Sequence, residues 1–492
     1  MGIKYKLKYK MKKQFLFLAI LLGSCCAQAK VVPNSLFTDH AVFQQGVKVP
    51  VWGTADKNES VIVEFNGQRK QAVEKEGRWL VELDAMPHGG PYVLTISGKE
   101  NRVEATDIYV GEVWICSGQS NMERQLGPRQ GQNPIVNWEQ ERDAANYPLI
   151  REYYVPRMNA DEPVDDARSK WQVCSPQTVS EFSCVGYFFA RDLHKAVNRP
   201  VGILFSAVGG TPAEYWTARA ELEQYPDLRA IVERYDRSLI DFAQKQAVYK
   251  RGGGVGEAPS NPAEQRHVSG HYNGMIRPLQ PYAIKGVAWY QGESNDGRTK
   301  QYQTLFPLMI KNWREDWKQP NLPFLFVQIA PFKNQSPEIR EAQLLTLKST
   351  PYTAMVVTVD CGDANDIHPT HKQPVGYRLS LAARALAYGE NIPYSGPVYQ
   401  FSERQGNQMT IHFSQVGRGL MAKGKELKGF TIAGEDKQFV PAKAEIKGNT
   451  VVVSSPHVQS PVAVRYGWAH VPDVNLFNKD NLPASPFRTD VE

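Results

Sequence analysis

Residues 113–122 read VWICSGQSNM, an apolar run that ends in a polar turn containing Gly118. Four further apolar runs follow at wide spacing, separated by long segments with helical character. Short buried strands that alternate with helical segments are typical of a parallel sheet covered by helices on both faces. The sequence therefore predicts an α/β fold with strands at residues 113–116, 201–205, 284–290, 324–328 and 355–359.

Two of the connecting segments carry a clear helical pattern. After the fifth strand, Pro374 occupies a favoured first position of a helix and Gly389 a favoured stop. Between the third and fourth strands, apolar residues recur at helical spacing. These residues are Tyr302, Leu305, Phe306, Met309, Ile310, Trp313 and Trp317.

The regions on either side of this α/β core have a different pattern of apolar and polar residues. Residues 30–106 form short alternating runs separated by turns such as Asn66-Gly67, a pattern that indicates a small β-sandwich. Short strand-like runs return after residue 396, at 408–413, 450–454 and 462–466. We therefore predict an N-terminal β-sandwich domain (30–106), an α/β domain (107–395) and a β-rich C-terminal segment (396–492).

The first 29 residues (1–29) have the features of a secretory signal peptide. They combine several lysines, an apolar run at residues 15–22 and the small-residue exit Ala27-Gln28-Ala29. We expect cleavage after Ala29 and a secreted or periplasmic protein, with lipid attachment through Cys25 as an alternative. The apolar run is too short for the roughly 20 residues of a membrane span, so none is predicted.

The formal net charge of +6 belongs to this leader. Its six lysines are its only charged residues, and without them the chain has 51 basic and 51 acidic residues. The chain after the leader has no net positive charge with which to attract nucleic acid. We therefore exclude nucleic-acid binding as the function.

Four cysteines remain after the leader, which is too few for a disulfide scaffold. Cys174 and Cys184 are close in sequence and could bridge a loop in an oxidising compartment. Cys116 and Cys361 lie in or beside apolar runs, which predicts buried thiols.

Polar turns follow four of the predicted strands. In an open α/β sheet the active site lies beyond the carboxyl ends of the strands, so these turns should converge. They contain Ser120, the Gly209-Gly210 pair, Gln291 and, after the last strand, His368. A serine on a tight turn, backbone and amide donors and a late histidine are the parts of serine-based acyl transfer.

Each of these residues also has a purely structural interpretation. Ser120 could cap a helix, the two glycines could serve a simple turn, and His368 could be a surface histidine. Their expected convergence at one sheet edge favours chemistry. The serine follows the first strand and lacks a Gly-x-Ser-x-Gly elbow, which is unlike an α/β-hydrolase.

The pair of motifs at residues 117–122 and 289–295 resembles the sialate O-acetylesterases, a branch of the SGNH hydrolase superfamily of carbohydrate esterases. The resemblance covers nearly all of the mature chain and implies a flavodoxin-like, three-layer α/β/α domain. It also implies that Ser120 is the nucleophile and that His368 is the general base. The oxyanion hole would then use the Ser120 N–H, an N–H of Gly209 or Gly210, and the side chain of Gln291.

The resemblance further implies residues that contact the substrate or shape its pocket. Asn273 belongs to a block ahead of the third strand, and Trp216 could offer an apolar face to a sugar ring. Glu293 is expected mainly to hold its loop, because an ionised carboxylate cannot donate a hydrogen bond. The full set of candidates is Gln119, Asn121, Glu293, Asn273 and Trp216.

The acid that would orient His368 departs from the superfamily pattern. The position three residues before the histidine, which is usually an aspartate, is Asn365. Asp366, Asp363 or a backbone carbonyl could take over the task, and we favour Asp366. His371 is a rival base, although the Ile-His-Pro context favours His368.

The sequence predicts neither a metal nor a cofactor. His267 and His271 are four residues apart, yet nothing nearby supplies the remaining ligands of a zinc site. We therefore expect an exported esterase that removes O-acetyl groups from a carbohydrate, with sialic acid implied by the resemblance. Acetylated xylan is the alternative substrate. A lipase or thioesterase, or a carbohydrate-binding protein on an esterase scaffold, are less favoured, and the oligomeric state stays open.

Overall fold

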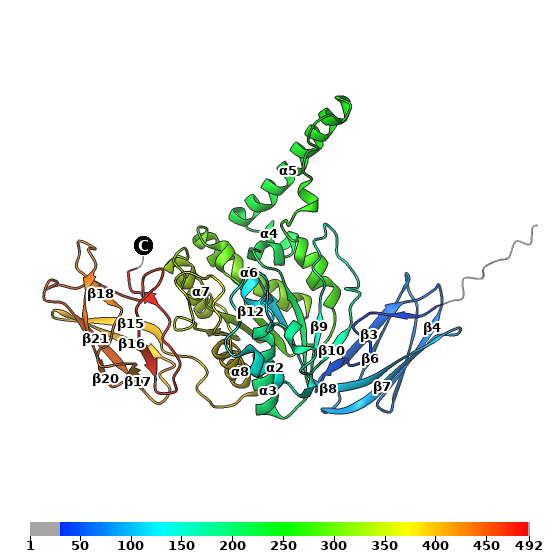
Figure 1. Ribbon diagram of the computed structural model, residues 1–492, viewed down its shortest axis with the longest axis horizontal. Coiled ribbons are helices and arrows are strands. Elements are labelled where there is room, and N and C mark those ends of the chain that lie inside the picture. The colour runs from blue at the N-terminus through cyan, green and yellow to red at the C-terminus, as the bar shows by residue number, and fades with distance from the viewer. Residues whose placement is uncertain (1–29, 491–492) are drawn as a thin grey trace, which may run out of the picture.

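A computed structural model describes residues 30–490, and its centre is a mixed α/β layer (Figure 1). Five parallel strands run through this layer in the order β11-β8-β12-β13-β14. Numbered among these five strands alone, this order is 2-1-3-4-5, which is the order of flavodoxin-like sheets. The strands are β8 (Arg102–Gly118), β11 (Val201–Ala207), β12 (Gly286–Tyr290), β13 (Phe324–Val327) and β14 (Thr353–Val356). All five predicted strands are thereby confirmed.

Helices cover both faces of this sheet. Alternate residues of each strand belong to different cores: Trp114 packs in the core that includes helices α3 and α8, and Ile115 in the core that includes α6 and α7. This alternation follows from the two-residue period of a strand. The helices are α3 (Cys184–Val197), α6 (Thr299–Asp316), α7 (Pro337–Ser349) and α8 (Gln373–Tyr388), and α6 and α8 confirm the two predicted helical segments.

Two further strands extend one edge of the sheet and were not expected from the sequence. β9 (Tyr147–Tyr154) is parallel to β11, and β10 (Trp171–Cys174) is antiparallel to β9. β9 lacks an apolar pattern because Arg151 and Glu152 are both buried within it. Arg151 donates to the carbonyls of Pro148 and Asp107, and it pairs with the Asp107 carboxylate at 3.0 Å, which compensates its charge.

Residues 30–97 form two sheets that share one apolar core, as expected for a β-sandwich. The Asn66-Gly67 turn joins β4 and β5 with positive φ at both residues, as in a tight hairpin. β8 continues from this region into the α/β sheet, across the boundary predicted at residues 106 and 107. The division into domains stays a prediction. The strands are β1 (Val32–Pro33), β2 (Val42–Gln44), β3 (Val49–Thr54), β4 (Ser60–Phe65), β5 (Gln68–Val73), β6 (Arg78–Leu83) and β7 (Gly89–Ser97).

The C-terminal part is built from short antiparallel strands on the opposite side of the α/β layer (Figure 1). Its strands β16, β21 and β22 confirm the three predicted runs. The strands are β15 (Val398–Gln405), β16 (Gln408–Ser414), β17 (Leu420–Ala422), β18 (Phe430–Ala433), β19 (Val440–Pro441), β20 (Lys443–Lys447), β21 (Thr450–Ser454), β22 (Ala463–Tyr466), β23 (Leu476–Asn478) and β24 (Phe487–Arg488).

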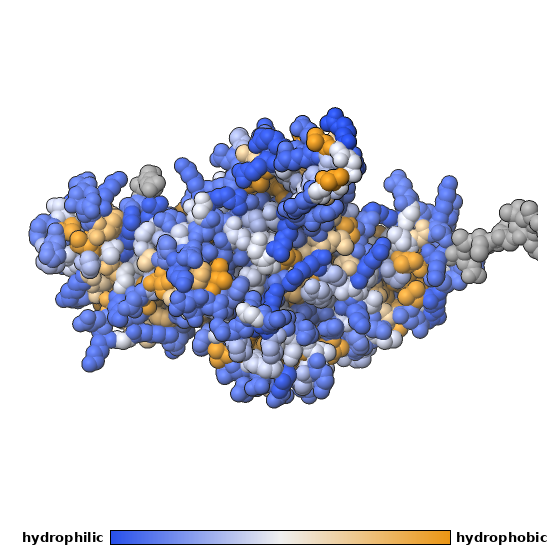
Figure 2. Space-filling model, turned by 45° about the horizontal axis from the view of Figure 1, so that its top comes forward, coloured by the Kyte–Doolittle hydropathy of each residue, from blue (hydrophilic) through white to orange (hydrophobic). Residues whose placement is uncertain are grey.

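The long helix α5 (Pro226–Arg251) projects from the α/β layer as an arm (Figure 1). Only residues near its start, Leu228, Ile231 and Val232, are buried. The face of the molecule drawn in Figure 2 is largely hydrophilic, with scattered apolar patches. In the described part of the chain, no helix is both long and apolar enough to cross a membrane. The predicted signal peptide, with Cys25 and Ala29, lies outside the described residues.

The bridge that the sequence left open between Cys174 and Cys184 is absent from the structure. All four cysteines in residues 30–490 are free and buried. Cys174 ends β10 and Cys184 begins α3, and both pack in the core on the α3 side of the sheet. Burial raises the pKa of both thiols to about 12, which keeps them protonated and unreactive.

Gly118 is a residue at which the fold tolerates little change. It has a φ of +137°, and an added Cβ would overlap the backbone carbonyl of Tyr290. We predict that Gly118→Ala lowers the free energy of unfolding by about 2 kcal/mol or more, measured by urea denaturation. The matched control is Gly67→Ala, which also has positive φ but open space around it, and which should cost about 1 kcal/mol. Equal losses in the two variants would contradict this account.

Candidate active site

A cavity of about 430 Å³ opens where the strands β8, β11 and β12 end. Side chains and backbone from four separate turns line it, as expected for the carboxyl edge of a parallel sheet. The structure therefore brings Ser120 and His368 to one cavity although 247 positions separate them in the sequence. The lining residues are Gln119, Ser120, Glu123, Arg129, Gln132, Arg157, Gly209, Gly210, Arg266, Glu293, Ser294, Ile367 and His368.

Ser120 begins the short helix α1 (Ser120–Glu123), directly after β8. Ser120 and Glu123 of this helix line the cavity, whereas Asn121 and Met122 between them are buried. The interpretation of Ser120 as a helix cap does not hold, because the cap position is Gln119. Gln119 is fixed on both sides: its N–H donates to the Tyr290 carbonyl, and its side-chain oxygen accepts the N–H of Ser294.

The Gly209-Gly210 turn lies against Ser120. A Cβ added to Gly209 would come within 3.1 Å of the Ser120 Cβ, and Gly210 has a φ of +71°. The Val208 N–H donates to the Gly118 carbonyl, which ties this turn to the one that carries Ser120. Among residues 30–490, nothing accepts a hydrogen bond from the N–H of Ser120 or of Gly209. Both donors are available to a bound group.

Asp366 is the acid beside His368. One Asp366 oxygen accepts the His368 backbone N–H at 2.8 Å and lies 3.9 Å from the imidazole Nδ1, beyond hydrogen-bond distance. Asp363 is exposed and accepts the backbone N–H groups of Asn365 and Asp366 instead. His371 is exposed and does not line the cavity. Of the two histidines, only His368 lines the cavity.

A buried polar network connects the turns beneath the cavity. The Asn121 side-chain amide donates to Glu293 at 2.7 Å and to the Ile367 carbonyl at 3.0 Å, and its oxygen accepts from the Lys372 ammonium. Asn121 therefore joins the serine turn, the Glu293 turn and the loop that carries His368. Lys372 was not expected from the sequence, because a single lysine among polar residues gives no sign that it will be buried.

Burial decides the charges in this network. It lowers the pKa of Lys372 to about 8 and raises the pKa of Glu293, because a charged group is poorly solvated inside the protein. One Glu293 oxygen faces no hydrogen-bond partner within residues 30–490. Burial also lowers the pKa of His368, and the nearby Lys372 charge lowers it further, against the opposite effect of Asp366. The imidazole is thus held neutral, as a general base requires.

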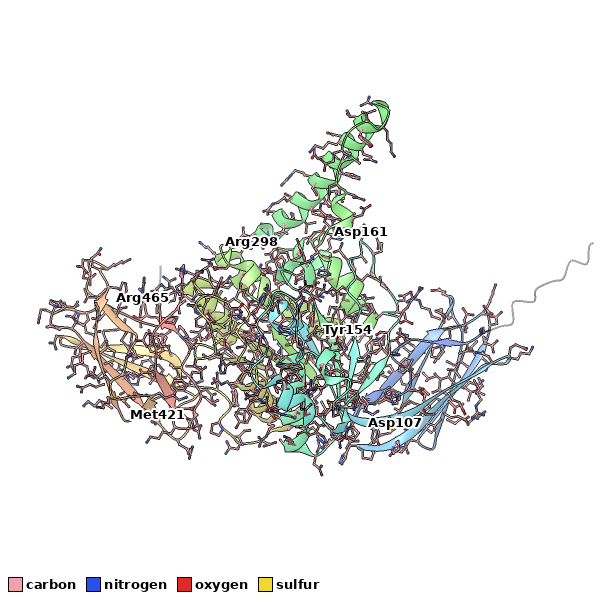
Figure 3. All side chains as sticks on the ribbon, in the orientation of Figure 1. Asp107, Tyr154, Asp161, Arg298, Met421 and Arg465 are labelled. Atoms are coloured by element: carbon pink, nitrogen blue, oxygen red, sulfur yellow. The ribbon has the colours of Figure 1, made fainter. Side chains whose placement is uncertain are left out.

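Gln291, expected in the oxyanion hole, does not line the cavity, and its expected role stays a prediction. Gln291 is fully buried outside the cavity, and its amide nitrogen donates to the Thr211 carbonyl and to Asn295. Asn295 in turn donates to Glu214, which pairs with Arg298 at 2.6 Å (labelled in Figure 3). Both amide hydrogens of Gln291 are used internally, so it braces the turn.

Trp216 and Asn273 do not line the cavity either, and their expected contact with substrate stays a prediction. Trp216 is fully buried, and its indole N–H donates to the Thr211 hydroxyl at 2.9 Å. Asn273 lies in the helical turn η4 (Tyr272–Ile276) and donates to the carbonyls of Ala160 and Asp161, near the base of the α5 arm (Figure 3). Both residues hold the surrounding scaffold.

Three arginines at the cavity were missed because they lie on separate loops and belong to no motif. They are Arg129, Arg157 and Arg266. The carboxylate of Glu123 pairs with Arg157 at 2.5 Å and with Arg129 at 3.2 Å. Within residues 30–490, no cluster of three or more His, Cys, Asp or Glu side chains could hold a metal ion.

An α/β sheet with a serine, a histidine and free backbone N–H groups at its carboxyl edge is typical of one class of proteins, the carboxylic ester hydrolases. Comparison with known proteins then identifies the family. Residues 110–248 and 262–386 match the family described as carbohydrate esterase, sialic acid-specific acetylesterase. The match covers more than half of the chain, and the chain belongs to this family of carboxylic ester hydrolases.

Individual relatives agree with this assignment. The chain is similar to the sialate O-acetylesterase of Mus musculus, with 29% identity over 84% of this chain and 84% of the mouse protein. The Homo sapiens sialate O-acetylesterase is 27% identical, over 89% and 88% of the two chains. The crystal structure of a carbohydrate acetylesterase from Xanthomonas citri has a TM-score of 0.83 and 37% identity, and covers 94% of this chain and 100% of that one.

Asn121 should be the polar residue on which the site depends most for stability. Asn121→Ala leaves a carboxylate, a carbonyl and an ammonium group buried without this partner, so we predict a loss of about 3 kcal/mol in the free energy of unfolding. Asn133→Ala is the matched control, because Asn133 is exposed and donates one bond to Asp366. It should cost less than about 1 kcal/mol. Urea denaturation of both variants tests this, and similar small losses would contradict it.

Proposed function

We propose that this carbohydrate esterase removes O-acetyl groups from sialic acid through an acetyl-enzyme on Ser120, with His368 as general base. The observation that carries the proposal is that Ser120, His368 and the Gly209-Gly210 turn line one cavity. The proposal includes the fold of an SGNH hydrolase, with a three-layer α/β/α domain, an N-terminal β-sandwich and a β-rich C-terminal segment.

The first half of the reaction forms the acetyl-enzyme. The Ser120 oxygen attacks the acetyl carbonyl carbon while the neutral imidazole of His368 takes the hydroxyl proton. The bond between that carbon and the sugar oxygen then breaks, and the imidazolium gives its proton to the departing sugar hydroxyl. In the second half, water attacks the acetyl group with the imidazole again as base, and acetate leaves.

Negative charge develops on the carbonyl oxygen in both halves. The free N–H groups of Ser120 and Gly209 are suitable donors, because they are rigid and bring no charge of their own. With Gln291 committed elsewhere, the side-chain amide of Gln119, which lines the cavity, is the third donor in our proposal. Asp366 acts on His368 mainly by holding its backbone N–H and by its negative charge.

The compartment in the proposal follows from the sequence of the leader. Residues 1–29 have the pattern of a signal peptide, and the protein would be secreted or periplasmic after cleavage near Ala29. Lipid attachment through Cys25 is the alternative.

Replacing the nucleophile should abolish acetate release. We predict that Ser120→Ala lowers kcat/KM by roughly 10³-fold or more with the fold intact. Ser294→Ala is the matched control, a second serine on the cavity wall to which we give no chemical role. The measurement is acetate release from O-acetylated sialic acid and from acetylated xylo-oligosaccharide, side by side. Release from xylo-oligosaccharide alone would contradict sialic acid as the substrate but would be compatible with the mechanism. Full activity of Ser120→Ala would contradict the mechanism.

The charge of Lys372 should set the acid limb of the pH profile. Lys372→Met removes a positive charge beside His368, so the pKa of His368 should rise and activity should begin to fall at a higher pH. The other charged groups that act on His368, namely Asp366, Arg129 and Arg124, are unchanged. The measurement is kcat/KM against pH, with exposed Lys333→Met as control. An unshifted acid limb, or a shift to lower pH, would contradict this prediction.

A further inference from the structure

The rim of the cavity carries more positive than negative charge. Arg129, Arg157 and Arg266 line it, against the carboxylates of Glu123 and Glu293. Arg157 and Arg129 both pair with Glu123, so one carboxylate serves two guanidinium groups. Burial favours the neutral form of Glu293, which reduces the negative charge still further.

Arg266 has no carboxylate partner within residues 30–490. Its guanidinium donates to the Gly209 carbonyl, and a Cβ added to Gly210 would lie 3.4 Å from one of its nitrogens. The side chain is exposed, so its remaining N–H groups face solvent and cavity. Holding an arginine against a glycine turn has no evident structural benefit for the fold.

Arg266 and Arg157 both contact groups that lie beside Ser120. A Cβ added to Gly209 would be 3.1 Å from the Ser120 Cβ and 3.0 Å from a Glu123 oxygen. Arg157 holds that Glu123 carboxylate, and Arg266 holds the Gly209 carbonyl. A ligand group that lies over the Gly209-Gly210 turn would therefore meet both guanidinium groups while its ester lies at Ser120.

We propose that Arg266 and Arg157 form a carboxylate-binding site beside Ser120, which selects O-acetylated sugars that carry an acid group. The proposal rests on the proposed function and names the substrate class of the same cavity. Guanidinium groups bind carboxylates through paired, charge-assisted hydrogen bonds. A neutral acetylated sugar would offer these groups no counter-charge, whereas the carboxylate of a sialic acid would.

The test compares one sugar with and without its charge. O-acetylated sialic acid and its carboxyl methyl ester carry the same acetyl group, and the selectivity is the ratio of their kcat/KM values for acetate release. Wild type should prefer the free acid. Arg266→Gln should lower this ratio about tenfold or more, and Arg157→Gln should lower it in the same direction. Changes in fold or in chemistry affect both substrates equally and cancel in the ratio.

Arg237→Gln is the matched control, because Arg237 is an exposed arginine on the α5 arm, outside the cavity. Its ratio should equal that of wild type, and raised salt should lower the wild-type ratio by screening. Equal hydrolysis of the free acid and the methyl ester by wild type would contradict the proposed carboxylate-binding site. It would not contradict the proposed esterase activity. Hydrolysis of acetylated xylo-oligosaccharide alone would overturn the proposed sugar together with this site.

Discussion

The close packing of β8 between its two neighbours is the constraint on which the site depends. β8 pairs with β11 on one side and with β12 on the other, and its last residue, Gly118, lies opposite Ala207 and Tyr290. Because Gly118 has no side chain, the backbones of the three strands can lie close together there, and any added Cβ would overlap Tyr290. The turns that follow these strands then meet at Ser120. β8 also pairs with β2 and β7, so the same strand continues into one of the two N-terminal sheets.

Charge around the cavity is organised in two layers. Below Ser120, Asn121 connects Glu293 and Lys372 in a buried network that holds three loops together and keeps His368 neutral. At the rim, Glu123 holds two arginines, and Arg266 braces the turn beside the nucleophile. In our account the inner layer prepares the base, and the outer layer meets the substrate.

Sequence patterns predicted the parts of the molecule that depend on local periodicity. The five central strands, two of the helices and the position of Ser120 after the first strand follow from apolar runs and turn glycines. The buried charges of β9, the burial of Lys372 and the rim arginines depend on contacts between distant residues, and no local pattern signals them. Gln291 shows the same limit. A polar residue in a turn at the carboxyl edge of the sheet can contact substrate or support the scaffold, and only its hydrogen-bond partners distinguish the two.

The central claim is that Ser120 is the nucleophile, and covalent labelling tests it most directly. The protein is treated with a phosphonate ester that reacts with activated serines, and the modified peptide is identified by mass spectrometry. The account predicts a single adduct on Ser120, formed more slowly in His368→Ala. An adduct on another serine, such as Ser294, or hydrolysis of acetyl esters that continues after complete labelling, would contradict it.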